Sequence, residues 1–131
     1  MFFKGDSISR TEVPKEITEL AERLCNKSGF SRYPMSAVIY KFKKNKSVVI
    51  STGVNRHLFI GQTKQTRGKY GTPYSIHAER DAIMGCSKQD LYGAHIYVHR
   101  KGYKLARPCI KCMNLIMSTG INHIHWSNGG I

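Results

Sequence analysis

The chain has 131 residues, of which 40 % are hydrophobic and 22 % are charged, with a formal net charge of +13; this composition provides the core of one domain and excludes a disordered tail or a collagen-like fibre. No apolar run approaches the roughly 20 residues that span a bilayer, and the N-terminal sequence MFFKGDSISR is too polar for a secretory signal. We therefore expect a single domain over residues 1–131 in the cytoplasm, where thiols stay reduced and paired cysteines indicate a metal before a disulfide.

The first half of the chain predicts a helix, a hairpin and a long loop. Apolar residues recur at helical spacing in the run PKEITELAERLCN, which begins at Pro14, and Gly29 is expected to end this helix. Cys25 falls on the apolar face and is expected in the core. Residues 35–42 and 47–52 are rich in β-forming residues and predict two strands of a hairpin. The segment 53–74 has turn residues without periodicity and is expected to be a loop.

The second half alternates predicted helices and strands. Helices are expected over 75–86 and 108–119, the second with Pro108 at its start and Gly120 just past its end. Strands are expected over 94–99 and 121–126, and the basic segment RKGYKLAR (100–107) is expected to be a loop. The order α-β-β-α-β-α-β indicates an α/β fold, and helical crossovers favour parallel pairing of the strands they join.

Two cysteines stand at the start of the helix predicted over 108–119, in the sequence Pro108-Cys109-Ile110-Lys111-Cys112. Residues three apart lie on the same face of a helix, and the N-terminus of a helix lowers the pKa of a thiol. Two adjacent thiolates suit a soft, tetrahedral cation. The pair alone fits zinc, redox chemistry or coincidence, but a redox pair is expected in a thioredoxin-like unit, which this sequence does not contain.

A metal held by two thiols needs further ligands, and His77 in the sequence His77-Ala78-Glu79 is the best candidate. It begins a helix that is expected to lie beside the cysteine helix. Residues two apart on a helix point about 200° apart, so Glu79 is expected to reach a water on the ion rather than the ion itself. Three protein ligands, an open fourth position and a nearby carboxylate form the plan of a catalytic zinc site. The other histidines are interpreted as structural or exposed: His57, His95, His99, His123 and His125.

The paired motifs His-Ala-Glu and Pro-Cys-x-x-Cys resemble the signature of the zinc-dependent cytidine and deoxycytidylate deaminase superfamily, in its deoxycytidylate and tRNA adenosine deaminase-like branch. The resemblance runs from about residue 35 to residue 126, over the segments SAVIYKFKKNKSVVISTGVN, SIHAERDAIMGC, GAHIYV and PCIKCMNLIMSTGINHIHW. It implies a three-layer α/β/α cytidine deaminase-like fold with a mixed central sheet. Members usually continue with a further strand and helix, so the fold is expected to be shortened at the C-terminus, with an open sheet edge that invites a homo-oligomer.

The resemblance also implies the roles of individual residues. His77, Cys109 and Cys112 would bind Zn²⁺, which lowers the pKa of its water. Glu79 would take a proton from that water and relay it to the ring nitrogen and then to the departing ammonia, while hydroxide attacks the amine-bearing carbon of cytosine or adenine.

Three further positions would contact the substrate. Asn55 would contact the sugar, the backbone N–H of Ala78 the base carbonyl, and the backbone carbonyl of Arg107 the leaving amine.

Simpler interpretations stand beside these. The metal could be structural, with Cys86 or a stray histidine as a fourth ligand, although Glu79 would then have no purpose. Asn55 could be a turn residue that tolerates a left-handed conformation. Cys86 is interpreted as a core thiol.

The positive charge bears on the substrate. Residues 1–22 contain three basic and five acidic side chains, whereas residues 23–131 contain 18 basic and three acidic ones. The partner is therefore expected to be a pyrimidine nucleotide or a single-stranded nucleic acid, although a basic charge run can simply be a solvated surface. Three hypotheses follow: a deaminase of a nucleotide such as deoxycytidylate, which the motifs favour, a deaminase of cytosine or adenosine within RNA or DNA, and a silent zinc module that binds nucleic acid. The presence of Glu79 argues against the last.

Overall fold

A computed structural model describes residues 13–27, 34–57 and 75–127, and within these ranges the architecture is a mixed four-stranded sheet with the strand order β2-β1-β5-β6. Strand β1 pairs antiparallel with both β2 and β5, whereas β5 and β6 are parallel. The bounds are β1 Met35–Lys43, β2 Lys46–Val54, β5 His95–Arg100 and β6 His123–Trp126. Since β1 is antiparallel to both of its neighbours, β2 and β5 run in the same direction, as expected for strands joined by a helix.

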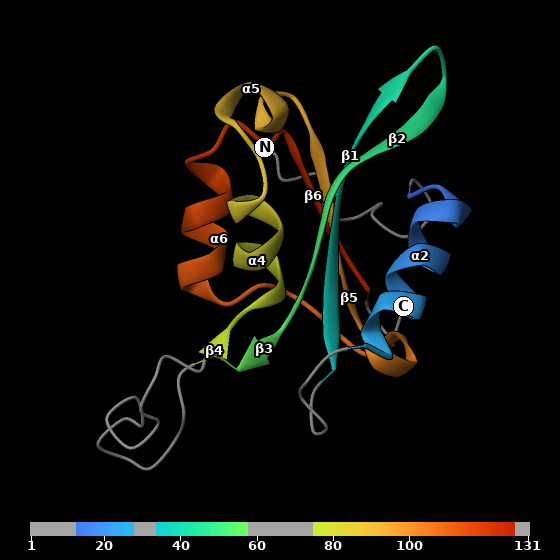
Figure 1. Cartoon of the computed structure of the whole chain (residues 1–131), viewed down its shortest axis with the longest axis vertical. Helices are drawn as coiled ribbons and strands as arrows, with labels where there is room; N and C mark the ends of the chain where they lie inside the picture. The colour runs from blue at the N-terminus through green and yellow to red at the C-terminus, as the bar shows by residue number, and fades with distance from the viewer. Residues whose placement is uncertain (1–12, 28–33, 58–74, 128–131) are drawn as a thin grey trace.

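Helices cover both faces of this sheet. Figure 1 shows α2 (Lys15–Cys25) on one side, and α4 (Ala78–Met84) and α6 (Ile110–Met117) together on the other. The short helix α5 (Lys88–Leu91) follows α4, and a 3₁₀ turn (Lys101–Tyr103) follows β5. The predicted three-layer α/β/α fold with a mixed sheet is confirmed. None of the helices in the described ranges is long and apolar enough to cross a membrane.

The core has one part on each face of the sheet. Helix α2 buries Ile17 and Ala21 against Val38, Tyr40 and Tyr97 of the sheet. The opposite part is larger and contains residues of α4, α6 and all four strands or their ends, including Ala37, Ile39, Ala82, Ile96, Ile116 and Trp126. The amphipathic helix predicted from Pro14 is confirmed, and Cys25 is buried as expected. The helix ends at Cys25, and Gly29 lies outside the described residues.

The two helices that carry the candidate site begin later than the sequence predicts. Ser75–Ile76 form the strand β4, which pairs antiparallel with β3 (Arg56–His57), and this pairing keeps the backbone extended up to His77. Helix α6 starts at Ile110, because Cys109 is also extended. His77 and Cys109 are therefore each the last residue before a helix rather than part of its first turn.

The predicted loop 53–74 and the segment after α4 also need correction. Strand β2 continues to Val54 and β3 follows at once, while residues 58–74 lie outside the described residues. Helix α5 was not predicted, although its capping box is visible in the sequence: the Ser87 hydroxyl accepts from the N–H of Asp90, and the Asp90 carboxylate accepts from the N–H of Ser87.

Three of the histidines interpreted as structural or exposed lie together on the face of the sheet that packs against α2. His95 of β5 stacks on His123 of β6, with ring centroids 4.3 Å apart, and its Nδ1 lies 3.2 Å from Nε2 of His125. Burial lowers the pKa of both His95 and His125 to about 4, with neighbouring histidines adding to the effect. The planes of the stacked rings are nearly parallel, and among the described residues the side chains grouped closely enough to hold a metal ion do not include these histidines.

These histidines predict a loss of stability in mild acid. Their pKa values are depressed in the folded state, so the unfolded chain binds more protons as the pH falls from about 6.5 to about 4, and the free energy of unfolding falls with it. The loss is up to roughly 3 kcal/mol for His125, which is 2 % exposed. Urea unfolding at several pH values checks this. A variant carrying His95→Phe and His125→Phe should have a flatter dependence over this range, and an unchanged dependence would contradict the assignment.

Candidate active site

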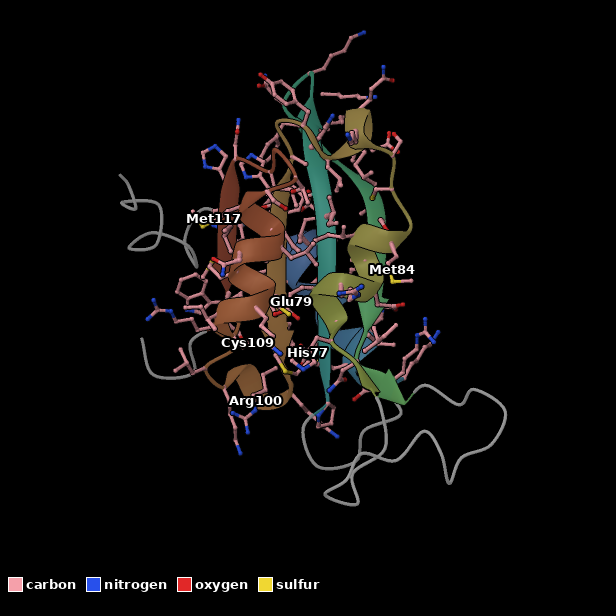
Figure 2. All side chains as sticks on the ribbon, turned by 90° about the vertical axis from the view of Figure 1, so that its left-hand side faces the viewer. His77, Glu79, Met84, Arg100, Cys109 and Met117 are labelled. Atoms are coloured by element: carbon pink, nitrogen blue, oxygen red, sulfur yellow. The ribbon has the colours of Figure 1, made fainter. Side chains whose placement is uncertain are left out.

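Three side chains with metal-binding atoms converge where α4 and α6 begin. His77 Nδ1 lies 3.3 Å from Cys112 Sγ and 3.8 Å from Cys109 Sγ, and one donor atom from each residue falls within 4.8 Å of the others. His77 comes from the junction of β4 and α4, Cys109 immediately precedes α6, and Cys112 lies one turn into α6. Figure 2 shows His77 and Cys109 facing each other with Glu79 beside them.

These separations fit a tetrahedral zinc site. Bonds of about 2.3 Å to sulfur and about 2.0–2.1 Å to nitrogen, at tetrahedral angles, place the nitrogen and sulfur donors roughly 3.5 Å apart. The two observed separations, 3.3 and 3.8 Å, lie on either side of that value. Two thiols and one imidazole also form the donor set that zinc prefers. The residues present therefore fit the metal that the motifs imply.

No fourth histidine, cysteine or carboxylate belongs to this group among the residues that the structure describes. Cys86 lies elsewhere: it is half-buried, and its thiol donates to the carbonyl of Ala82 at 3.6 Å. Its position agrees with a packing role and gives no support to its being a fourth ligand. The described donors thus account for three of the four positions of a tetrahedral site.

Glu79 lies beside this group and is nearly buried, with 3 % of its surface exposed. Burial raises the pKa of the Glu79 carboxyl, and this effect exceeds the lowering by its own backbone N–H, by His77 and by the Cys112 side chain. Burial, Glu79 and Cys109 also raise the pKa of the Cys112 thiol to about 12. Two thiols and a carboxyl that lie this close repel one another when they are ionised, so a bound cation would stabilise their ionised forms.

Asn55 sits in the turn between β2 and β3 and is 7 % exposed. Its side-chain oxygen accepts a hydrogen bond from the N–H of Met35 at 2.9 Å, and its backbone N–H donates to the Met35 carbonyl. Asn55 therefore ties the end of β2 to the beginning of β1. The simpler interpretation is correct in placing Asn55 in a turn but wrong about a left-handed conformation, because the described non-glycine residues with positive φ are Lys44 and Asn45.

The other two predicted contact residues come from the two segments that carry the metal-binding side chains. Ala78 is the first residue of α4 and is buried, directly between His77 and Glu79 in the chain. Arg107 precedes Pro108 and Cys109, and its guanidinium carbon lies 5.8 Å from the centre of the Trp126 ring. This cation–π contact involves the Arg107 side chain, whereas the predicted role belongs to its backbone carbonyl. The role of the carbonyl stays a prediction.

A buried serine, which the sequence analysis did not single out, organises the loop that leads to Cys109. The Ser127 hydroxyl donates to the Lys104 carbonyl at 2.6 Å and accepts from the Arg100 N–H at 3.0 Å. Its backbone carbonyl accepts from the N–H of Ala106. No local pattern predicts this role, because the three partners precede Ser127 by 20 residues or more.

Ser127→Ala is expected to lower the free energy of unfolding by about 1–2 kcal/mol, because it removes two part-buried hydrogen bonds, one from the Arg100 N–H and one to the Lys104 carbonyl. Denaturant titration measures the change. Ser118→Ala is a matched control, since the Ser118 hydroxyl is exposed and bonds only the nearby Leu115 carbonyl. Equal stability of the two variants would contradict the importance of the Ser127 hydroxyl.

Comparisons with known proteins find one matching family model and similar relatives. The model of the cytidine and deoxycytidylate deaminase zinc-binding region matches residues 11–128. A deoxycytidylate deaminase of Mycobacterium phage D29 is 40 % identical over 50 residues, which are 38 % of this chain and 34 % of that protein. The match thus spans about a third of the length of this relative.

Solved structures reproduce the fold at low sequence identity. The apo dCMP deaminase of cyanophage S-TIM5 has a TM-score of 0.62 and 19 % identity, over 87 % of this chain and 81 % of that one. The same enzyme in complex with dCMP and dUMP has a TM-score of 0.60 and 20 % identity, over 88 % and 83 %. At these identities the structural likeness establishes the fold. The family model matches nine-tenths of the chain, and the matched residues include both motifs. The chain belongs to the family defined by the cytidine and deoxycytidylate deaminase zinc-binding region.

Proposed function

We propose that the protein is a zinc-dependent hydrolytic deaminase that converts the cytosine base of a nucleotide such as deoxycytidylate to uracil. The observation that carries this proposal is the group of His77, Cys109 and Cys112 with the buried Glu79 carboxyl beside it. A purely structural zinc site needs four protein ligands and has no use for a buried carboxyl. The relatives support the choice of reaction, because one is a deoxycytidylate deaminase and another is solved with dCMP and dUMP.

His77 Nδ1 and the sulfurs of Cys109 and Cys112 would hold the zinc. When bound, the metal supplies Lewis-acid chemistry that lowers the pKa of a coordinated water towards neutrality. Glu79 moves two protons in turn: its carboxyl takes a proton from water and passes it to the ring nitrogen of the base while the water oxygen bonds to the amine-bearing carbon. It then takes the remaining proton of the new hydroxyl and gives it to the amine, which leaves as ammonia when the C–N bond breaks. The raised pKa of Glu79 suits this work, since the carboxyl must both accept and release a proton near neutral pH.

Asn55, Ala78 and Arg107 would orient the substrate. The Ala78 N–H would hold the base carbonyl, a role supported by its position in the chain between the proposed metal ligand His77 and Glu79. Asn55 would contact the sugar from the β2–β3 turn, and the Arg107 carbonyl would face the leaving amine. These roles require that the turn, the start of α4 and the segment before α6 keep a fixed mutual arrangement.

The charge balance favours an anionic substrate over a free nucleoside. Exposed basic side chains adjoin the site residues in the chain: Arg80 follows Glu79, and Lys111 lies between the two cysteines. Arg56, which follows Asn55, is half-buried and paired with Asp81. Such a field attracts phosphate. A single-stranded nucleic acid would be attracted in the same way. Comparing a nucleotide with nucleic-acid polymers as substrates distinguishes the two.

The test is a panel of deoxycytidylate, cytidine, single-stranded DNA and tRNA, incubated with zinc-loaded protein, with the product base identified. We expect uracil formation to be fastest from deoxycytidylate, with weak dependence on salt, because one phosphate releases few counterions. Turnover of a polymer alone, with a steep salt dependence, would replace the nucleotide assignment. No turnover of any of the four by zinc-loaded protein would refute the proposed activity.

A further inference from the structure

The carboxylate of Asp81 binds the turn that contains Asn55. One oxygen accepts from the N–H of Val54 at 3.1 Å, and the other accepts from Nε and Nη2 of Arg56 at 3.1 and 2.9 Å. Asn55 is thus the single residue between two residues held by the same carboxylate. We propose that Asp81 is a positioning residue that fixes the Val54–Arg56 turn on α4 and thereby determines how tightly the nucleotide binds. This inference rests on the proposed function.

The backbone beneath this contact is close-packed, so the turn and the helix cannot separate freely. A Cβ atom on Gly53 would lie 2.4 Å from the N of Ala82 and 2.5 Å from the carbonyl oxygen of Ala78, so only glycine permits β2 to approach α4 this closely. The Ser51 hydroxyl adds a hydrogen bond to the Ala82 carbonyl at 2.8 Å. Asp81 therefore completes an existing contact between strand and helix, and what it adds is the placement of the turn beyond Gly53.

The Asp81 carboxylate is one of few acidic groups in a strongly basic part of the chain. Residues 23–131 contain three acidic side chains, namely Glu79, Asp81 and Asp90. Glu79 lies in the candidate site and Asp90 caps α5. Asp81 uses both of its oxygens on the turn, and its side chain is 19 % exposed, against 43 % for Arg56. An ion pair between exposed groups contributes little, but a carboxylate that also binds a backbone N–H fixes the direction of the chain at that point.

The helix held by Asp81 is the one that begins with Ala78 and carries Glu79. The base-binding and proton-moving groups are therefore on α4, and the sugar-binding group is on the turn. Asp81 connects the two. When the carboxylate is lost, the metal-binding group and Glu79 stay in place, and Asn55 keeps its two hydrogen bonds to Met35. The turn loses its bonds to α4, so the distance from Asn55 to Ala78 and Glu79 is less tightly fixed.

Asp81→Asn tests this, because asparagine keeps the shape of the side chain and removes the charge. We expect KM for deoxycytidylate to rise about 10- to 100-fold, with kcat within about threefold of the parent and zinc bound at one ion per chain. Arg56→Gln should raise KM in the same direction but less, since it leaves the Val54 N–H bonded. Asp90→Asn is the matched control: it removes the same charge from the α5 cap and should leave KM unchanged.

An unchanged KM in Asp81→Asn would overturn the inference, as would a loss of zinc and kcat without a change in KM, because that pattern belongs to a residue that only supports the fold. Failure of the parent protein to act on deoxycytidylate would instead refute the proposed function. The parent and the variant measured side by side therefore distinguish the two failures.

Discussion

Glu79→Gln is expected to lower kcat for deamination by about 10³- to 10⁴-fold, which is the contribution of a well-placed general acid and base. Glutamine preserves the size and much of the hydrogen bonding of the side chain but cannot accept a proton from water. Since Glu79 is nearly buried and its pKa is raised by that burial, removing its charge costs the fold little. Zinc content and the thermal midpoint should stay close to those of the parent. The measurement is kcat for deoxycytidylate together with metal analysis of the same preparation.

The control for this variant is Glu19→Gln, which removes a carboxylate from the exposed face of α2 and should leave kcat unchanged. Turnover of Glu79→Gln within tenfold of the parent, with zinc still bound, would contradict the proton-relay role. A parallel loss of zinc and of activity would show that Glu79 supports the metal group instead.

Cys112→Ser is expected to abolish measurable activity and to lower zinc affinity at least 100-fold. A serine hydroxyl is a poor ligand for zinc at neutral pH, whereas a thiolate bonds it at about 2.3 Å. Cys112 is also the most buried of the three proposed ligands, so no other described side chain is placed to substitute for it. Competition with a chromogenic chelator measures the affinity, and deamination of deoxycytidylate measures the activity.

Cys86→Ser provides the matched control, because Cys86 is half-buried but lies outside the metal-binding group. It should bind zinc and turn over substrate like the parent. Equal zinc affinity in Cys112→Ser and Cys86→Ser would contradict the assignment of Cys112.

The elements that periodicity and turn chemistry specify locally were predictable from the sequence. Helix α2 follows from its apolar stripe, and the β1–β2 hairpin follows from two β-rich runs around a turn at Lys44 and Asn45, both of which have positive φ. The site motifs were visible too, since each is a short string. The motifs do not specify the backbone conformation. His77 precedes α4 instead of lying in it, because β4 pairs with β3, a strand that is distant in the sequence.

Contacts between distant segments were beyond prediction from one sequence. The Asp81 carboxylate meets Val54 and Arg56 from 25 to 27 residues away, and no spacing rule pairs them. The same holds for the stack of His95, His123 and His125, which arises from the parallel register of β5 and β6. Sequence patterns fix the residues that share a face of one element, whereas these contacts depend on which elements become neighbours.

X-ray absorption at the zinc edge tests the central claim most directly, when it is combined with metal analysis of the purified protein. The account predicts one zinc per chain, with two sulfur neighbours at about 2.3 Å and two nitrogen or oxygen neighbours at about 2.0–2.1 Å. Cys109→Ser with Cys112→Ser should remove the sulfur signal along with the metal. Three or four sulfur neighbours, or protein that binds no zinc at all, would contradict a site built from His77, Cys109 and Cys112.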